Sequence, residues 1–169
     1  MTISMYRASV PVFKQMLKNL DAILDKAVEY AERRKIAPQV LLSARLAPDM
    51  LDFTKQIQIA SDNAKGISAR LAGSEPPKME DNEQSFADLK GRIQKTLAFL
   101  DTLKPGQIDG SEERDIRLKL GPQEVQFKGI DYLLSFGLPN FMFHVTTAFD
   151  ILRHNGLEIG KRDFLGGGR

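Results

Sequence analysis

Apolar residues recur every three or four positions in four separate stretches of this chain, and this spacing restricts the fold more than any other feature. The stretches span approximately residues 4–34, 50–71, 85–103 and 139–156. Residues three or four apart share one face of an α-helix, so each stretch predicts an amphipathic helix that buries one side. No strands alternate with these helices, which argues against an α/β fold. The pattern therefore predicts an all-α fold, a four-helix bundle.

Residues that start or stop helices mark the ends of these stretches. Pro11 interrupts the first, so its helix either begins there or kinks there. Asp49 precedes the second and is expected to cap it or to lie in its first turn. Gly73 suits the C-terminal end of the same helix. The segment GSEPPKMEDNE that begins at Gly73 contains adjacent prolines, so we expect a connection there.

The stretch DIRLKLGPQEVQFKG, residues 115–129, changes period and alternates apolar with polar residues around Gly-Pro. Such alternation predicts a short β-hairpin between the third and fourth helices. A lone hairpin is only marginally stable in water, so its apolar face should lie on the bundle or on a partner. The next segment, GIDYLLSFGL, is apolar and leaves open a short helix or an extended strand.

The chain of 169 residues suits one domain, residues 1–169. After the fourth helix, Ile159, Phe164 and Leu165 are expected to pack back onto the bundle, and residues 165–169 to form a flexible tail. The first helix carries a second apolar stripe, Met5, Val12, Met16 and Ile23, which suits either deep burial or an interface between two copies.

The composition excludes several classes of function. There are no cysteines, so the chain has no disulfide, thiol nucleophile or thiolate metal site. The net charge is only +2, and the densest basic run, Glu32–Lys35, suits a helix C-terminus, so we expect no nucleic-acid partner. No apolar run is long enough to span a membrane, and the N-terminus does not resemble a signal peptide. We therefore expect a cytoplasmic protein.

Both histidines lie in the fourth predicted helix. At about 100° per residue, His144 shares the apolar face with Asn140 and Thr147 and should point inward. His154 lies about 80° away around the helix and in its last turn, where a cation complements the helix dipole. His144 is either a core histidine bonded to Asn140, Thr147 or a backbone carbonyl, or a working ligand or base.

A metal site at His144 would need oxygen donors, because no second histidine can reach it. The second predicted helix offers Asp49, Asp52 and Gln56. Asp49 and Gln56 flank the buried seam of that helix, whereas Asp52 is turned further out. One imidazole with a carboxylate and amide oxygens could hold a divalent metal such as zinc, nickel or manganese, but more weakly than three imidazoles. The candidate metal ligands are thus His144 and Asp49.

Three motifs resemble a bacterial family of unknown function in the DinB/YfiT-like superfamily of four-helix bundles. They are LPNFMFHVTTAFDILRHNG, GKRDFLG and RLAPDM. The resemblance covers nearly the whole chain and implies a bundle, often a homodimer. Metal-binding members carry three histidines, two of them four residues apart on the last helix. If Leu152-Arg153 is the anchor, those two positions fall on Asn140 and His144 here. The third, expected on the second helix, has no histidine, and Asp49 is the nearest polar candidate.

This departure from the family pattern leaves three functional hypotheses. The first, which we favour, is a non-catalytic or small-ligand-binding bundle with a degenerate metal site, using His144, Asn140, Thr147 and Gln56. The second is a metal-dependent hydrolase or thiol transferase with a His/Asp/Asn site. The third is an interaction protein that dimerises through the hairpin edge or the second stripe of the first helix. We expect a homodimer and an unidentified small molecule as partners.

Overall fold

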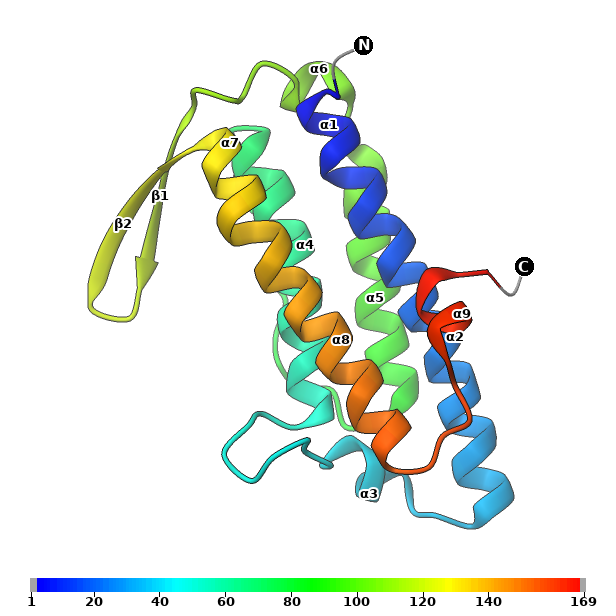
Figure 1. The fold of residues 1–169 in the computed structure, drawn as a ribbon. Helices are drawn as coiled ribbons and strands as arrows, with labels where there is room; N and C mark the ends of the chain where they lie inside the picture. The colour runs from blue at the N-terminus through cyan, green and yellow to red at the C-terminus, as the bar shows by residue number, and fades with distance from the viewer. Residues whose placement is uncertain (1–2, 168–169) are drawn as a thin grey trace.

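The computed structural model describes residues 3–167, without the side chain of Leu120, and is mostly helical. Four long helices lie side by side and form the predicted bundle (Figure 1). The hairpin lies between the third and fourth of them, as expected. The elements in order are α1 (Met5–Ala8), α2 (Val10–Arg34), α3 (Pro38–Leu42), α4 (Phe53–Leu71), α5 (Phe86–Thr102), α6 (Pro105–Ile108), β1 (Asp115–Leu120), β2 (Gln123–Lys128), α7 (Gly129–Asp131), the π-helix η1 (Tyr132–Gly137), α8 (Leu138–His154) and α9 (Lys161–Leu165).

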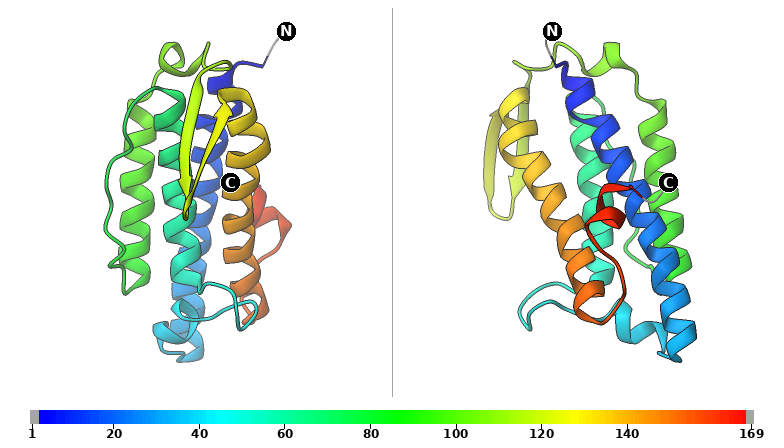
Figure 2. Two further views of the ribbon diagram at one scale, coloured as in Figure 1. Left: turned by 90° about the vertical axis from the view of Figure 1, so that its left-hand side faces the viewer. Right: turned by 45° about the vertical axis from the view of Figure 1, so that its right-hand side comes forward.

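The long helices do not simply alternate in direction. Helices α2 and α8 run one way, whereas α4 and α5 both run the other way, so α4 and α5 are parallel neighbours (Figures 1 and 2). Residues 72–85 connect them by returning along the length of the bundle (Figure 2). Such a crossover is one of the known variants of four-helix topology. Within residues 3–167, no helix combines the length and the apolar character needed to cross a bilayer.

The second apolar stripe of the first predicted helix is buried within this chain. Met5, Met16 and Ile23 are at most 7% exposed, and Val12 is half-buried. The short helix α9 packs on α2 and accounts for part of this cover (Figure 1). Of the two readings left open by the sequence, deep burial is the one that the fold shows for these side chains.

Helix starts agree with the sequence in two cases and differ in one. Helix α2 begins at Val10 with Pro11 in its first turn, and Ser85 caps α5 by accepting a hydrogen bond from the Asp88 amide. The prediction that Asp49 caps the second helix was wrong. Helix α4 begins at Phe53, and its cap is Asp52, whose Oδ1 accepts a hydrogen bond from the Lys55 N–H at 2.9 Å. Asp49 lies in the preceding loop and is exposed.

The hairpin pairs β1 with β2 in antiparallel register, with Ile116 opposite Phe127. Gly121, at φ +59°, and Pro122 form the two-residue turn, and this positive φ favours glycine. Ile116 is buried, and the Phe127 ring packs against Tyr132 at a centroid distance of 6.0 Å. The apolar face of the hairpin therefore lies on the bundle, one of the two placements that the sequence allowed.

The segment that the sequence left ambiguous, residues 129–138, is helical. Helix α7, η1 and α8 follow one another without a break, and Pro139 lies in the first turn of α8. Beyond α8, Ile159 is buried and the Phe164 ring contacts Phe149 edge-on at 5.6 Å, as expected. Leu165 is 58% exposed, so the prediction that it packs back was wrong. Residues 166–167 hydrogen-bond back to α9, and 168–169 lie outside the described residues.

Candidate functional site

His144 lies in the middle of α8 and points into the seam between α8 and α4. It is 9% exposed, and its Nδ1 lies 2.7 Å from Oε1 of Gln56 on α4. The sequence predicted the inward orientation and named Gln56 among the oxygen donors of this site, whereas the partners expected for a core histidine, Asn140, Thr147 or a backbone carbonyl, were wrong. Two residues 88 positions apart are thus joined by a buried hydrogen bond.

The side-chain amide of Gln56 fixes which imidazole nitrogen carries the proton. Its Nε2 donates to the Leu51 carbonyl at 3.0 Å, so its Oε1 must be the atom that faces His144. An amide oxygen only accepts hydrogen bonds, and the neutral imidazole has a single N–H. His144 Nδ1 therefore holds that proton and donates it to Gln56. Nε2 is left with a lone pair and has no protein hydrogen-bond partner within residues 3–167.

Burial lowers the pKa of His144 below its usual value of 6.5, and no charged neighbour adds to the shift. Transfer of a cation out of water costs free energy, so the neutral imidazole is favoured near pH 7. The site thus presents a neutral, oriented acceptor nitrogen. The exposed ring of Phe143 meets the imidazole edge-on at a centroid distance of 5.2 Å.

Two other predicted site residues lie on the same side of α8 but take no part in the histidine bond. Asn140 Nδ2 approaches Oδ1 of Asn63 on α4 at 3.5 Å, the upper limit for a hydrogen bond. The Thr147 hydroxyl donates to the Phe143 carbonyl at 2.7 Å, so its proton is already used. His144 and Asn140 thus line one seam with Gln56 and Asn63, while Thr147 contributes mainly to the local structure of the helix.

The sequence did not single out Asn63, Phe143 or Leu51. Asn63 lies seven residues after Gln56, a spacing that returns to the same helix face, so it could have been found. Phe143 resembled one more core aromatic, but it is 54% exposed. The role of the Leu51 carbonyl depends on loop geometry that no periodicity encodes.

The residues at the seam do not fit the metal centre that the superfamily resemblance implied. Asp49 is exposed in the loop before α4, and Asp52 is occupied as a helix cap. Among the described residues, no three His, Cys, Asp or Glu side chains lie close enough to hold one ion. Catalytic zinc sites use three protein ligands, and this seam offers one imidazole and an amide oxygen that is already bonded. His154 is exposed in the last turn of α8, as expected.

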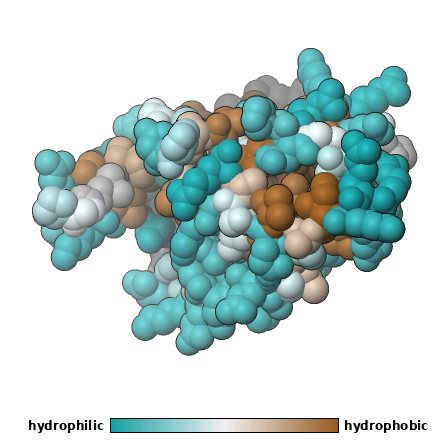
Figure 3. All heavy atoms as spheres, turned by 90° about the horizontal axis from the view of Figure 1, so that it is seen from below, coloured by the Kyte–Doolittle hydropathy of each residue, from teal (hydrophilic) through white to brown (hydrophobic). Residues whose placement is uncertain are grey.

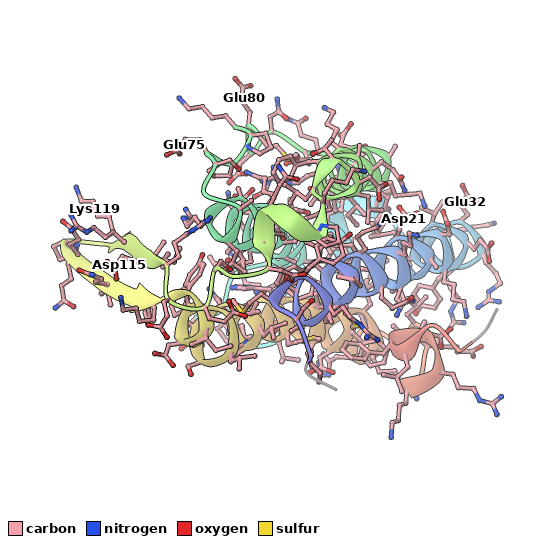
Figure 4. The ribbon with its side chains drawn as sticks, turned by 90° about the horizontal axis from the view of Figure 1, so that it is seen from above. Asp21, Glu32, Glu75, Glu80, Asp115 and Lys119 are labelled. Atoms are coloured by element: carbon pink, nitrogen blue, oxygen red, sulfur yellow. The ribbon has the colours of Figure 1, made fainter. Side chains whose placement is uncertain are left out.

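Charged side chains gather elsewhere on the molecule. The carboxylates of Glu32, Glu75 and Glu80 lie around the periphery of the bundle, and Asp21 of α2 pairs with Lys90 of α5 at 3.2 Å (Figure 4). A cavity of about 760 Å³ lies between residues 78–84 and α5, and it is lined by charged and polar groups that include Arg92 but none of the seam residues. The chemistry of the α4–α8 seam is therefore uncharged, in contrast to the α4–α5 side.

Comparison with known proteins places this geometry in context. The family model described as a domain of unknown function (DUF1993) matches residues 5–165. Among solved structures, the chain is similar to a DinB family member protein from Shewanella denitrificans, with 39% sequence identity and a TM-score of 0.86. That match covers 95% of this chain and 91% of the other. None of the curated proteins matches the chain.

Proposed function

Because the chain belongs to the DUF1993 family, whose function is unknown, and has a DinB-like fold, we propose its function from the seam itself: it is a non-catalytic bundle that binds a small molecule at His144. In this proposal the ligand donates a hydrogen bond to His144 Nε2. Gln56 holds the imidazole in position, and Asn140 and Thr147 line the same side of α8.

One observation carries the proposal, namely the chain of hydrogen bonds from the Leu51 carbonyl through Gln56 to His144. Here one ring nitrogen is fixed by a partner on another helix. The other, Nε2, has no protein partner among residues 3–167 and is not a buried unpaired atom, so it reaches the surface, where a ligand can replace water as the donor. Proteins use the same arrangement, one nitrogen bonded to orient the ring, when the other nitrogen must meet a ligand.

The alternative is a metal-dependent hydrolase or thiol transferase with zinc, nickel or manganese at His144 and Asp49. The donor set argues against it, because Asp49 lies in an exposed loop and a single imidazole is a weak site for these ions. The proposed function therefore involves no metal. Metal content remains a direct test, and we expect protein purified without a histidine tag or chelator to hold well under one equivalent.

Nitrogen NMR of the two histidine side chains tests the proposed function without a ligand. We expect His144 to be neutral near pH 7 with its proton on Nδ1. Gln56→Leu should abolish the single tautomer, since its acceptor is lost. Protonation of His144 on Nε2, or near one equivalent of metal that is lost in both His144→Ala and Asp49→Ala, would overturn the proposal.

A further inference from the structure

We infer that the ligand of this site is an uncharged molecule with an apolar body and a single O–H or N–H donor, of which a phenol is the simplest example. This inference rests on the proposed function and adds the chemical class of the ligand. Three properties of the seam carry it: the acceptor nitrogen of His144, the lack of charged side chains bonded to that histidine, and the exposed apolar ring of Phe143 beside it.

The acceptor nitrogen selects for a donor. His144 Nδ1 gives its proton to Gln56, so Nε2 can only accept. A ligand that has only acceptors, such as an ether or a carboxylate, would place two lone pairs against each other. A hydroxyl or N–H group forms a hydrogen bond there and satisfies the one unpaired polar atom of a side chain that is nine-tenths buried.

The seam offers no counter-ion for a charged ligand. Burial alone lowers the pKa of His144, which means that no neighbouring charge acts on the ring. The charged groups closest to Gln56 along the chain are Lys55 and Asp52, and both already have partners: Lys55 pairs with Asp81 at 2.9 Å, and Asp52 with Arg45 at 3.9 Å. An ion without a partner pays the full cost of leaving water, so an anion or a cation is disfavoured.

One exposed apolar side chain lies directly beside the imidazole. Phe143 is 54% exposed and contacts His144 edge-on at a centroid distance of 5.2 Å. The loop that holds Gln56 through the Leu51 carbonyl also exposes Leu51, at 46%, and Leu46, at 41%. Seen from below, the molecule shows an apolar patch ringed by hydrophilic side chains (Figure 3). An apolar ligand body bonded to His144 would cover the Phe143 ring, and such burial is the main source of affinity for a neutral molecule.

Three matched probes test the ligand class: phenol, anisole and benzoate. Phenol has the donor, anisole replaces its proton with a methyl group, and benzoate carries a charge. We expect phenol to give a saturable shift of the His144 Nε2 signal in nitrogen NMR, with anisole and benzoate at least about tenfold weaker. Phe143→Ala should weaken phenol binding by about fivefold. Leu165→Ala removes an equally exposed apolar side chain on α9 and should leave binding unchanged.

The outcomes distinguish a wrong ligand class from a wrong proposed function. If His144 carries its proton on Nδ1 but phenol does not saturate, or benzoate or anisole binds as well as phenol, the ligand class is wrong and the proposed function stands. If the proton is on Nε2, both fail. Phenol binding that persists in His144→Phe would show association with the apolar patch alone, which would also overturn the inference.

Discussion

At the scale of single residues, the most informative contact is the one between His144 and Gln56, because it joins two helices through a polar bond inside an apolar seam. Buried polar groups are costly when they are unpaired, so such a pair fixes how α4 and α8 face one another. Replacement of either residue should therefore change both the stability of the fold and the binding of a ligand.

Gln56→Leu removes the acceptor for the buried Nδ1–H of His144 while roughly preserving volume. We expect the free energy of unfolding to fall by about 1–3 kcal/mol, the cost of a buried donor without a partner. Urea denaturation measures it. The double variant Gln56→Leu/His144→Leu removes both partners and should recover part of the loss, whereas equal or greater destabilisation would contradict the pairing.

The lowered pKa of His144 predicts a dependence of stability on pH. In the unfolded chain the imidazole takes up a proton near pH 6.5, but in the folded protein burial keeps it neutral to lower pH. The unfolded state then binds more protons, so stability contributed at this site is present above about pH 6.5 and is lost as pH falls towards the folded pKa.

Urea denaturation from about pH 7.5 to about pH 5 would measure this dependence. The wild type should lose more stability over that range than His144→Gln, which cannot titrate there. A wild-type curve parallel to that of His144→Gln would show that the folded pKa is not lowered.

At the scale of elements, buried cations attach the crossover of residues 72–85. Lys65 of α4 donates to the Pro77 carbonyl at 3.0 Å, and Arg92 makes most of the other contacts. The Arg92 side chain, on α5, is 1% exposed and contacts Glu83 at 2.9 Å, Asp81 at 3.0 Å and Asp62 of α4 at 2.7 Å. Its Nη1 also donates to the Glu80 carbonyl at 3.0 Å. Two parallel helices need a long connection, and Arg92 attaches this connection, residues 72–85, to both α4 and α5.

Arg92→Met should therefore loosen the crossover and destabilise the fold. Glu83 would remain largely buried without its cation, while Asp62 and Asp81 are half exposed and screened by water. We expect a loss of about 3 kcal/mol and faster amide hydrogen exchange in residues 75–85. Lys95→Met changes an exposed cation one turn away and should do neither. Unchanged exchange in Arg92→Met would refute the attachment.

Two helix glycines offer a matched test of packing between elements. A Cβ on Gly137 would lie 3.0 Å from Ile67 Cδ1 of α4 and 3.1 Å from the Tyr132 carbonyl, whereas one on Gly91 of α5 would meet nothing within 4 Å. Gly137→Ala should lower the free energy of unfolding by about 1–3 kcal/mol. Gly91→Ala should raise it by about 0.5–1 kcal/mol. Thermal or urea unfolding would measure both, and equal effects would contradict the close packing.

The helices and the hairpin could be predicted from the sequence because both depend on local periodicity. The start of α4 could not, since Asp49 and Asp52 are both acids in one short stretch and only the packing of Phe53 selects the second. The Gln56–His144 bond could be predicted only in part. Periodicity showed that His144 faces inward and placed Gln56 among three candidate oxygen donors on the second helix, but which of the three meets the imidazole depends on how far α4 slides along α8.

At the scale of the whole molecule, α9 packs on α2 and holds the end of the chain against the bundle. The Phe164 carbonyl accepts a hydrogen bond from the Asn19 amide at 2.9 Å, and Lys26 pairs with Asp163. This clasp helps to cover the stripe that contains Met16 and Ile23. The homodimer expected from the sequence remains a prediction, but it would have to use another surface.

Ile23→Lys distinguishes the two roles of that stripe. Ile23 is 2% exposed within one chain, so a lysine there should destabilise the monomer by several kcal/mol instead of dissociating a folded dimer. Sedimentation would give the mass, and circular dichroism with heating would give the stability. A variant that melts like the wild type but halves in mass would show that the stripe is an interface after all.

The π-helix η1 has a consequence for how this chain can change in length. A π turn closes each hydrogen bond over one more residue than an α turn. The extra residue is absorbed by this wider turn, so deletion of one residue from Tyr132–Gly137 would restore α geometry and leave the flanking segments almost in place. The hairpin, whose Phe127 packs on Tyr132, would stay on the same side of the bundle. In relatives, a one-residue gap at this segment would therefore mark the loss of the π turn, not a relocated hairpin.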